Sequence, residues 1–402
     1  MAADLAIRNV RIIDGTGAPA REGEVAIEGS RISSVGNVPA AAREIDGRGL
    51  VLCPGFVDTH SHDDGAFIRY PGMEFKLAQG VTTVVAGNCG FSAMPRTGSG
   101  PDPLGASGGI LAGLEGEWTD LEGYFAACAA RRPAINNLML VGHNTMRVQA
   151  MGFEQRAPTA AELQQMRGWT EQAMAQGACG LSTGLIYRPG RWSDTEEVIR
   201  LAEMTAPFGG IYATHMRNEG ANLLRSVDET VRIGKEAGCG VHISHHKASG
   251  KANWGLVKDS LAKIDALVAA GEDITLDVYP YTAASGRMVE YFNLDAISRD
   301  LAEVIRIASC PAFPEFEGRM LEDIATEIAL SLEETVRLIL TAEKGDRTIC
   351  IQFTIDEADV ETNLRHPRVM IGSDGIPDLR GRPHPRLFGT FPRVLGEYVR
   401  ER

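Results

Sequence analysis

Residues 56–62 read Phe56-Val57-Asp58-Thr59-His60-Ser61-His62, a short apolar stretch that ends in two histidines. The stretch follows Pro54-Gly55 and has the length of a buried β-strand. Side chains at positions i and i+2 of a strand point to the same side, so His60 and His62 can face one metal ion. The stretch therefore predicts a strand with a candidate metal site at its carboxyl end.

Seven more short apolar stretches follow along the chain. They lie at residues 82–86, 137–141, 179–182, 210–213, 240–243, 274–278 and 368–371. Helical patterns separate several of them, at residues 160–176, 195–207, 221–237 and 256–270. Short strands that alternate with helices are typical of parallel βαβ units, and eight of them predict an α/β fold with a closed (β/α)8 barrel of the TIM type.

The flanks of this pattern predict additional structure. Residues 1–54 contain short β-rich stretches separated by acidic-Gly turns, which predicts a small N-terminal β-domain ahead of a barrel domain at residues 55–402. Residues 283–347, between the seventh and eighth strands, contain about two helical patterns and a Pro-rich turn. An insertion there lies over the barrel mouth, so we expect a lid. The Gly- and Pro-rich residues 95–116 predict a long loop.

The composition is that of a globular protein with an acidic balance. The 402 residues are 44% hydrophobic and 23% charged, and the formal net charge is −13. This charge argues against nucleic acid and anionic membranes as partners, although it permits a local basic pocket for a small anion. The seven cysteines contain no Cys-x-x-Cys pair, and no signal peptide or membrane span is visible. We therefore expect a reduced, cytoplasmic protein, and its oligomeric state stays open.

Other predicted strands also end in residues that can bind a metal. Cys89 follows the second strand, His215 the fifth, His245 and His246 the sixth, and Asp374 the eighth. The carboxyl ends of barrel strands meet at one rim, where such enzymes build their sites, and His, Cys and carboxylate are the ligand set of zinc. We interpret His143 as polar decoration and His242 as structural.

Several strings of the sequence resemble those of one enzyme family. They are Gly55-Phe56-Val57-Asp58-Thr59-His60-Ser61-His62-Asp63-Asp64, Gly87-Asn88-Cys89-Gly90, Ala213-Thr214-His215-Met216-Arg217-Asn218-Glu219, Ile243-Ser244-His245-His246-Lys247, Tyr279-Pro280-Tyr281, Gly372-Ser373-Asp374-Gly375 and Arg382-Pro383-His384-Pro385-Arg386. The order of the histidines and the aspartate resembles the amidohydrolase superfamily. The Gly-Asn-Cys-Gly string is similar to that of the N-acyl-D-amino-acid deacylase (D-aminoacylase) family within it, and the likeness runs from about residue 4 to the end.

The resemblance implies a role for each matching residue. Cys89, His215 and His245 would hold a tightly bound Zn²⁺, and His60 and His62 would form a second, weaker metal position that Cys89 also approaches. Asp374 would be the catalytic acid/base. The substrate, chiefly its α-carboxylate, would be bound by Lys247, Tyr281 and Arg386. Whether the reaction needs one metal or two stays open.

The reaction implied by the resemblance is zinc-dependent hydrolysis of a small-molecule N-acyl-D-amino acid to a D-amino acid and a carboxylate. Zinc acidifies water and polarises a carbonyl, which the hydrolysis of an unreactive amide requires, and Asp374 can carry the proton. The substrate's side chain and acyl group stay open. The resemblance also implies that strands following the last barrel helix, which complete the small β-domain in the family, are missing from this chain.

Two alternatives remain at the level of sequence. One is a cyclic-amide hydrolase of the hydantoinase or dihydroorotase type. These relatives usually bridge two metals with a carboxylated lysine on strand four, whereas residues 178–184 contain no lysine and Cys89 offers a substitute bridge. The other is an inactive, truncated relative that binds only a metal or a partner.

Overall fold

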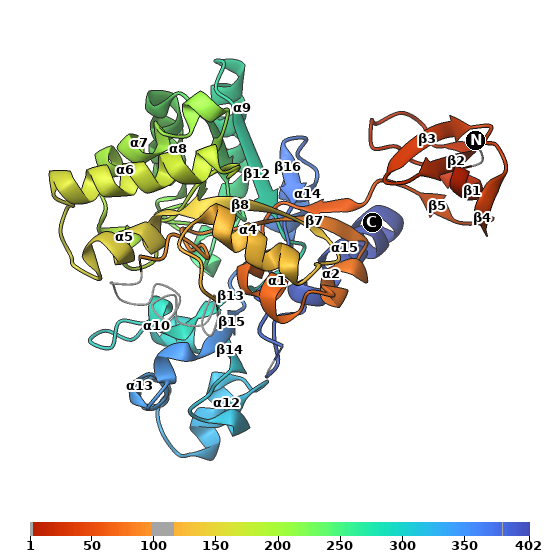
Figure 1. The fold of residues 1–402 in the computed structure, drawn as a ribbon. Coiled ribbons are helices and arrows are strands. Elements are labelled where there is room, and N and C mark those ends of the chain that lie inside the picture. The colour runs from red at the N-terminus through yellow and green to blue at the C-terminus, as the bar shows by residue number, and fades with distance from the viewer. Residues whose placement is uncertain (1–2, 98–115, 380) are drawn as a thin grey trace. The chain divides into compact units, whose positions relative to one another are not determined.

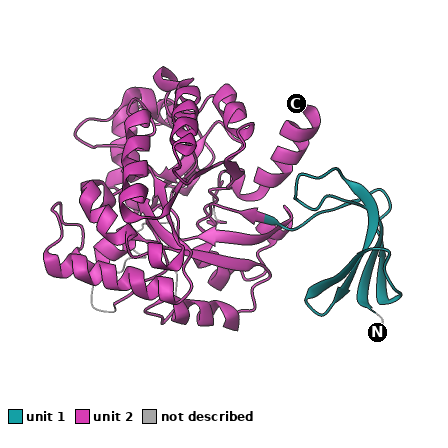
Figure 2. Cartoon of the chain, turned by 90° about the horizontal axis from the view of Figure 1, so that it is seen from above, with its two compact units in different colours: residues 1–56 teal, residues 57–402 magenta. Residues whose placement is uncertain are grey.

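A computed structural model describes residues 3–97, 116–379 and 381–402 (Figure 1). The chain divides into two compact units, Met1–Phe56 and Val57–Arg402 (Figure 2). Most of the loop predicted at residues 95–116 falls outside the described residues. Within the described ranges, no helix combines the length and the apolar character of a membrane span.

The first unit is a five-stranded sheet. Its strands are β1 (Ala3–Ile12), β2 (Arg21–Glu28), β3 (Arg31–Gly36), β4 (Ala41–Asp46) and β5 (Val51–Leu52). The order is β3-β2-β1-β4, with β5 paired to β1, and β4 and β5 run parallel to β1. Val10, Ile12 and Val25 form an apolar cluster on this sheet. The sequence predicts the three antiparallel strands, but not β4 and β5.

The second unit is built on eight parallel strands, as the sequence predicts. They are β6 (Phe56–Asp58), β7 (Val81–Ala86), β8 (Asn136–Gly142), β9 (Gly180–Gly184), β10 (Ile211–His215), β11 (Gly240–Ile243), β12 (Ile274–Val278) and β16 (Val369–Ile371). Beyond the two end strands, Asp374 N donates to His60 O at 2.8 Å and His62 N donates to Gly375 O at 3.1 Å. These bonds join the first and last strands, so the carboxyl ends of all eight meet at one rim.

Amphipathic helices cover the outside of the strands (Figure 1). They include α4 (Leu121–Ala130), α5 (His143–Met151), α6 (Ala160–Ala175), α7 (Thr195–Ala202), α8 (Leu223–Ala237), α9 (Leu256–Ala269), α14 (Glu357–Leu364) and α15 (Arg386–Arg393), with short helices α1 (Ala66–Arg69) and α2 (Glu74–Leu77) after β6. Asp194 caps α7 by accepting a hydrogen bond from Glu197 N at 2.8 Å. Val227 and Val231 of α8 and Leu261 of α9 belong to one buried cluster that fixes these helices against the sheet.

The insertion between β12 and β16 is larger than the sequence predicts. It contains β13 (Ala284–Arg287), α10 (Met288–Tyr291), α11 (Arg299–Ala302), β14 (Ile305–Ser309), α12 (Leu321–Glu327), α13 (Leu332–Thr341) and β15 (Ile349–Gln352). The two longer helices, α12 and α13, match the prediction, but the antiparallel sheet β13-β15-β14 does not, and it extends the insertion to Gln352. Ile307, Ile324, Ile339 and Cys350 belong to a core of its own.

A buried ammonium ties the first strand to the last. Lys76 on α2 is fully buried, and its Nζ donates to Asp58 Oδ2 at 2.6 Å and to Ser373 Oγ at 2.9 Å. Asp63 Oδ2 lies 3.1 Å from the same Nζ. Asp58 Oδ1 also accepts a hydrogen bond from Ser373 N at 2.7 Å. This network lies directly beside the residues that bring His60 and Asp374 together.

We expect Lys76→Met to lower the free energy of unfolding by about 3–5 kcal/mol, because the substitution leaves two buried carboxylates without their counter-ion. Equilibrium unfolding in urea measures this loss. Lys235→Met is the matched control, since Lys235 is exposed and its ion pair with Glu272 lies at the surface. Equal losses for the two variants would show that the buried network contributes no more to the free energy of unfolding than a surface ion pair does.

Candidate metal centre

Six side chains from five strand ends gather at one rim of the barrel. They are His60 and His62 after β6, Cys89 after β7, His215 at the end of β10, His245 after β11 and Asp374 after β16. All six are buried. The grouping expected from the sequence is therefore reproduced in space, and the contacts of each side chain indicate what it can do.

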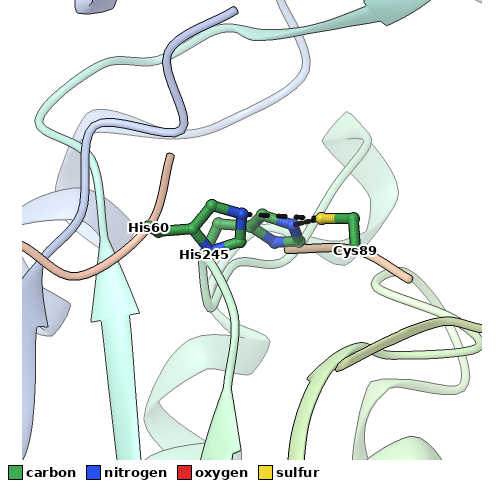
Figure 3. Close-up of side chains that lie close together, drawn as sticks. All are labelled: His60, Cys89 and His245. Carbon is green, nitrogen blue, oxygen red and sulfur yellow. Dashed lines mark hydrogen bonds between the residues drawn. The ribbon is translucent and has the colours of Figure 1, made fainter. Parts of the chain in front are cut away.

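The Cys89 sulfur lies at the centre of the histidines. Its Sγ is 3.5 Å from His60 Nε2, 3.5 Å from His245 Nε2 and 3.8 Å from His215 Nδ1. Figure 3 shows the His60 and His245 rings turned toward this sulfur. Burial alone raises the pKa of a thiol, but the surrounding imidazoles, His60 foremost, hold the pKa of Cys89 well below its usual value.

These donor atoms fit a zinc ion. Zinc bound at about 2.3 Å by sulfur and about 2.1 Å by nitrogen, with tetrahedral angles, separates the two donors by about 3.6 Å. The three sulfur–nitrogen distances lie between 3.5 and 3.8 Å. Among the described residues, three groups bring one ligand atom each within 4.8 Å of one another: His60, Cys89 and His245; His60, His62 and Asp374; and His215, Glu219 and His245. None of these groups combines Cys89 with His215. The donor set thus has room for a second metal position beside Cys89.

Asp277 orients the histidines, although the sequence analysis passed over it. Its Oδ2 lies 3.1 Å from His60 Nδ1 and 2.7 Å from His242 Nε2, and its Oδ1 accepts a hydrogen bond from His245 N at 2.8 Å. A carboxylate on one ring nitrogen fixes the tautomer and leaves the other nitrogen for a metal. The signal in the sequence is a lone charge inside the apolar strand β12.

Glu219 lies beside the other two histidines, and Lys247 Nζ lies 2.8 Å from His245 Nδ1. Its carboxylate lies 3.3 Å from His215 Nε2 and 2.9 Å from His245 Nδ1, and it accepts a hydrogen bond from Lys247 Nζ at 2.7 Å. Burial opposes ionisation, but His215 and Lys247 hold the pKa of Glu219 well below its usual value. Glu219 lies within a string that carries the family resemblance, yet its role becomes visible only in the structure.

Asp374 lies between the histidines and an arginine. Its Oδ1 is 3.1 Å from His62 Nε2 and 3.6 Å from His60 Nε2, and its Oδ2 is 2.8 Å from Arg386 Nη1. Burial would raise the pKa of Asp374, but Arg386 and then His62 hold it well below the usual value. His62 Nδ1 is buried and has no hydrogen-bond partner among the described residues, so this ring can still accept another ligand.

The backbone at the centre is strained. Eight non-glycine residues in the described ranges have a positive φ, and three of them are Cys89 at 55°, His245 at 37° and Asp374 at 49°. Such angles cost free energy and persist where the surroundings enforce them, often at functional sites. The strain therefore marks the same residues as the side-chain geometry does.

Cations and tyrosines form the wall next to Asp374. Lys247 Nζ lies 5.8 Å and Arg386 Cζ 4.7 Å from the ring centre of Tyr279, whose buried hydroxyl has no hydrogen-bond partner in the described part of the chain. Tyr281 instead contacts α15 and the residue before it. Its hydroxyl lies 3.5 Å from Pro385 O, and its ring lies against Arg393. Its predicted role in substrate binding stays a prediction, and Tyr279 is the residue that the sequence analysis missed.

The remaining histidines have structural partners. His246 lies 2.7 Å from Asn363 Oδ1 and 2.8 Å from Ser260 Oγ, so both of its ring nitrogens are engaged. His143 lies 2.8 Å from Glu197 Oε1, which also pairs with the buried Arg147. His242 is held by Asp277 and Thr275. These contacts agree with the interpretation of His143 and His242, and they exclude His246 from the group around Cys89.

The insertion closes the rim. Residues of β13 and α10, among them Gly286 and Arg287, line a small cavity together with Cys89, Tyr187 and Asp374. The cavity has a volume of about 20 Å³, which is room for one water.

Comparisons with known proteins agree with this geometry. The model of the "Amidohydrolase family" matches residues 43–314. A D-aminoacylase from Alcaligenes xylosoxydans xylosoxydans is 41% identical over 99% of this chain and 79% of its own length, and an N-acyl-D-glutamate deacylase from the same organism is 39% identical over the same shares. A similar solved structure is the crystal structure of an N-acyl-D-glutamate deacylase from Bordetella bronchiseptica, complexed with zinc and a phosphonate inhibitor. Its TM-score is 0.91 and its sequence identity to this chain is 38%. The match covers 100% of this chain and 82% of that one.

We expect Cys89→Ala to lose its tightly bound zinc, because Cys89 supplies the anionic donor between three imidazoles. Zinc per chain, measured by atomic emission after dialysis, tests this. Cys128→Ala is the control, since Cys128 is another buried cysteine, which lies on α4 and near Tyr124 rather than in the centre. A Cys89→Ala protein with the zinc content of the wild type would remove Cys89 from the ligand set.

Proposed function

The chain belongs to the amidohydrolase family, and on that premise we propose that it is a zinc-dependent hydrolase that cleaves the amide bond of N-acyl-D-amino acids. The products are a D-amino acid and a carboxylate. The observation that carries the proposal is the Cys89 sulfur among three imidazole nitrogens at 3.5–3.8 Å, with the Asp374 carboxylate next to the same ring of His60. The cyclic-amide alternative has less support, because the relatives that match 99% of the chain are deacylases by name.

Cys89, His215 and His245 hold the tightly bound metal in this proposal, and His60 and His62 form the second, weaker position. The nearly equal distances from Cys89 to His60 and to His245 support a sulfur shared by both positions. When bound, zinc supplies a Lewis acid and an acidified water. Asp277 keeps the His60 ring in the tautomer that leaves its other nitrogen facing the sulfur, and Glu219 lies close to the rings of His215 and His245.

Asp374 carries the proton of the reaction. Its Oδ1 faces the histidines and is the atom that accepts a proton from the attacking water and returns it to the departing amine. Its Oδ2 is engaged by Arg386, which holds the carboxylate in one orientation.

Arg386 and Lys247 bind the substrate's α-carboxylate. Arginine can engage a carboxylate with two parallel hydrogen bonds, whereas lysine offers a point charge. Tyr279 supports this assignment, since its ring lies against both cations and its hydroxyl is an unused donor. Tyr281 also contacts the substrate in this proposal, once the insertion has moved.

We also retain the two-domain organisation with residues 55–402 as the catalytic part, and a cytoplasmic site of action. The cysteine inventory supports that location, because all seven cysteines are unpaired and one of them must stay reduced to bind zinc. The compact unit Val57–Arg402 holds every ligand, proton carrier and cation named here.

The test of the proposal is a hydrolysis panel with zinc present. N-acetyl derivatives of D-leucine, D-glutamate and D-aspartate are compared with their L-enantiomers and with a hydantoin. We expect release of free amine from the D-substrates and little from the L-substrates. Cleavage of the hydantoin alone, or equal rates for the two enantiomers, would replace this function with another.

We expect Asp374→Asn to lower kcat by about 10²–10⁴-fold while zinc content stays unchanged, because an amide cannot accept and return the proton. Steady-state kinetics with the best D-substrate measure the loss. Asp194→Asn is the control, since Asp194 only caps α7 and asparagine caps a helix equally well. An Asp374→Asn enzyme with normal kcat would place the proton carrier elsewhere.

A further inference from the structure

Strand β9 supplies no ligand to the metal centre, yet one of its side chains touches the loop that carries Cys89. Ser182 is fully buried, and its Oγ accepts a hydrogen bond from Gly90 N at 3.1 Å. The same Oγ donates to Gly87 O. One hydroxyl therefore bonds both ends of the four-residue segment Gly87-Asn88-Cys89-Gly90.

That segment does not hold its shape by itself. Gly87, Cys89 and Gly90 all have a positive φ, at 77°, 55° and 80°. Cysteine rarely adopts this conformation, because its Cβ meets the backbone, so the surroundings must impose it. Gly87 N also donates to Asp64 Oδ2 at 3.1 Å, and Gly90 O accepts a hydrogen bond from Thr145 N at 3.1 Å. Ser182 is the group that bonds both ends of the segment through one atom.

Strand β9 also limits where Cys89 can lie. A Cβ added at Gly184 would come within 2.2 Å of Cys89 O, so the two backbones are in close contact. The hydroxyl of Ser182 and the bare backbone of Gly184 thus determine the distance and direction of the loop relative to the sheet. Shifting this loop moves the sulfur away from the three imidazole nitrogens.

We propose that Ser182 is a positioning residue that fixes the Cys89 loop and so sets the affinity of the metal centre. The proposal rests on the role of Cys89 as a metal ligand. In this proposal β9, the fourth barrel strand, contributes no metal ligand. Its residue Ser182 instead positions Cys89, the ligand that follows β7.

The neighbouring residue offers a matched control. Thr183 is also fully buried on β9, but its hydroxyl donates to Thr214 Oγ1 at 2.7 Å and lies 2.9 Å from Tyr212 OH. Thr183→Val therefore removes a buried hydroxyl from the same strand and leaves the contacts of the Cys89 loop in place. Any general cost of losing a hydrogen bond in this strand appears in both variants.

The experiment measures zinc affinity by competition with a chromophoric chelator. We expect Ser182→Ala to weaken binding by about 10–100-fold, the usual effect of removing a group that orients a ligand, and Thr183→Val to leave it unchanged. Cadmium-loaded protein gives a second readout, because the ultraviolet sulfur-to-cadmium charge-transfer band reports whether Cys89 still reaches the metal. This band should weaken per bound ion in Ser182→Ala only.

Each outcome has one meaning. Wild-type affinity and a full band in Ser182→Ala would overturn the proposal, and so would equal losses in Ser182→Ala and Thr183→Val. If Ser182→Ala does not fold, Ser182→Thr is compared with Ser182→Val. The two side chains are equal in bulk, but only threonine has a hydroxyl. Ser182→Thr must then bind zinc more tightly than Ser182→Val. A wild-type protein that binds no zinc would instead refute the proposed function.

Discussion

The buried Cys89 thiolate, surrounded by imidazole nitrogens at 3.5–3.8 Å, is the interaction on which the rest of the site depends. A buried anion is tolerated only where positive charge and hydrogen bonds compensate it. That requirement explains why three separate strand ends converge on one sulfur, and why the loop carrying it is held in an unfavourable conformation. It also makes the closure of the barrel a condition for binding, because β6 is the direct neighbour of β7, whereas β11 lies four strands away from β7 in the strand order.

Groups of opposite charge follow one another with increasing distance from the Cys89 sulfur. The imidazoles surround the thiolate, the carboxylates of Asp277, Glu219 and Asp374 surround the imidazoles, and the cations Lys247 and Arg386 pair with two of those carboxylates. Each buried charge thus has an opposite charge next to it, which limits the desolvation cost.

The sequence predicts the barrel well because buried parallel strands read as short apolar runs, and eight of them are present. The sequence does not predict strands that lack such an apolar run. Strand β4 is almost wholly exposed, and β13 reads Ala-Ser-Gly-Arg, so neither shows an apolar run. For the site, donors at strand ends are visible in the sequence, whereas Asp277 lies inside a strand and acts on histidines from other strands. Tyr279 and Tyr281 are two residues apart, yet a hydrogen bond from Tyr281 N to Tyr279 O turns the chain between them, so the rings diverge.

Burial beside the metal centre keeps the nearby tyrosines protonated. Burial raises the pKa of Tyr279 to about 12 and the pKa values of Tyr187 and Tyr291 well above the usual value, so all three hydroxyls remain neutral donors. A buried donor without a partner costs about 1–3 kcal/mol. The Tyr279 hydroxyl is such a donor within the described residues, and it lies on the ring that faces Lys247 and Arg386. The protein bears this cost next to two cations that already pair with Glu219 and Asp374, so the unused donor and both buried ion pairs lie at the same place.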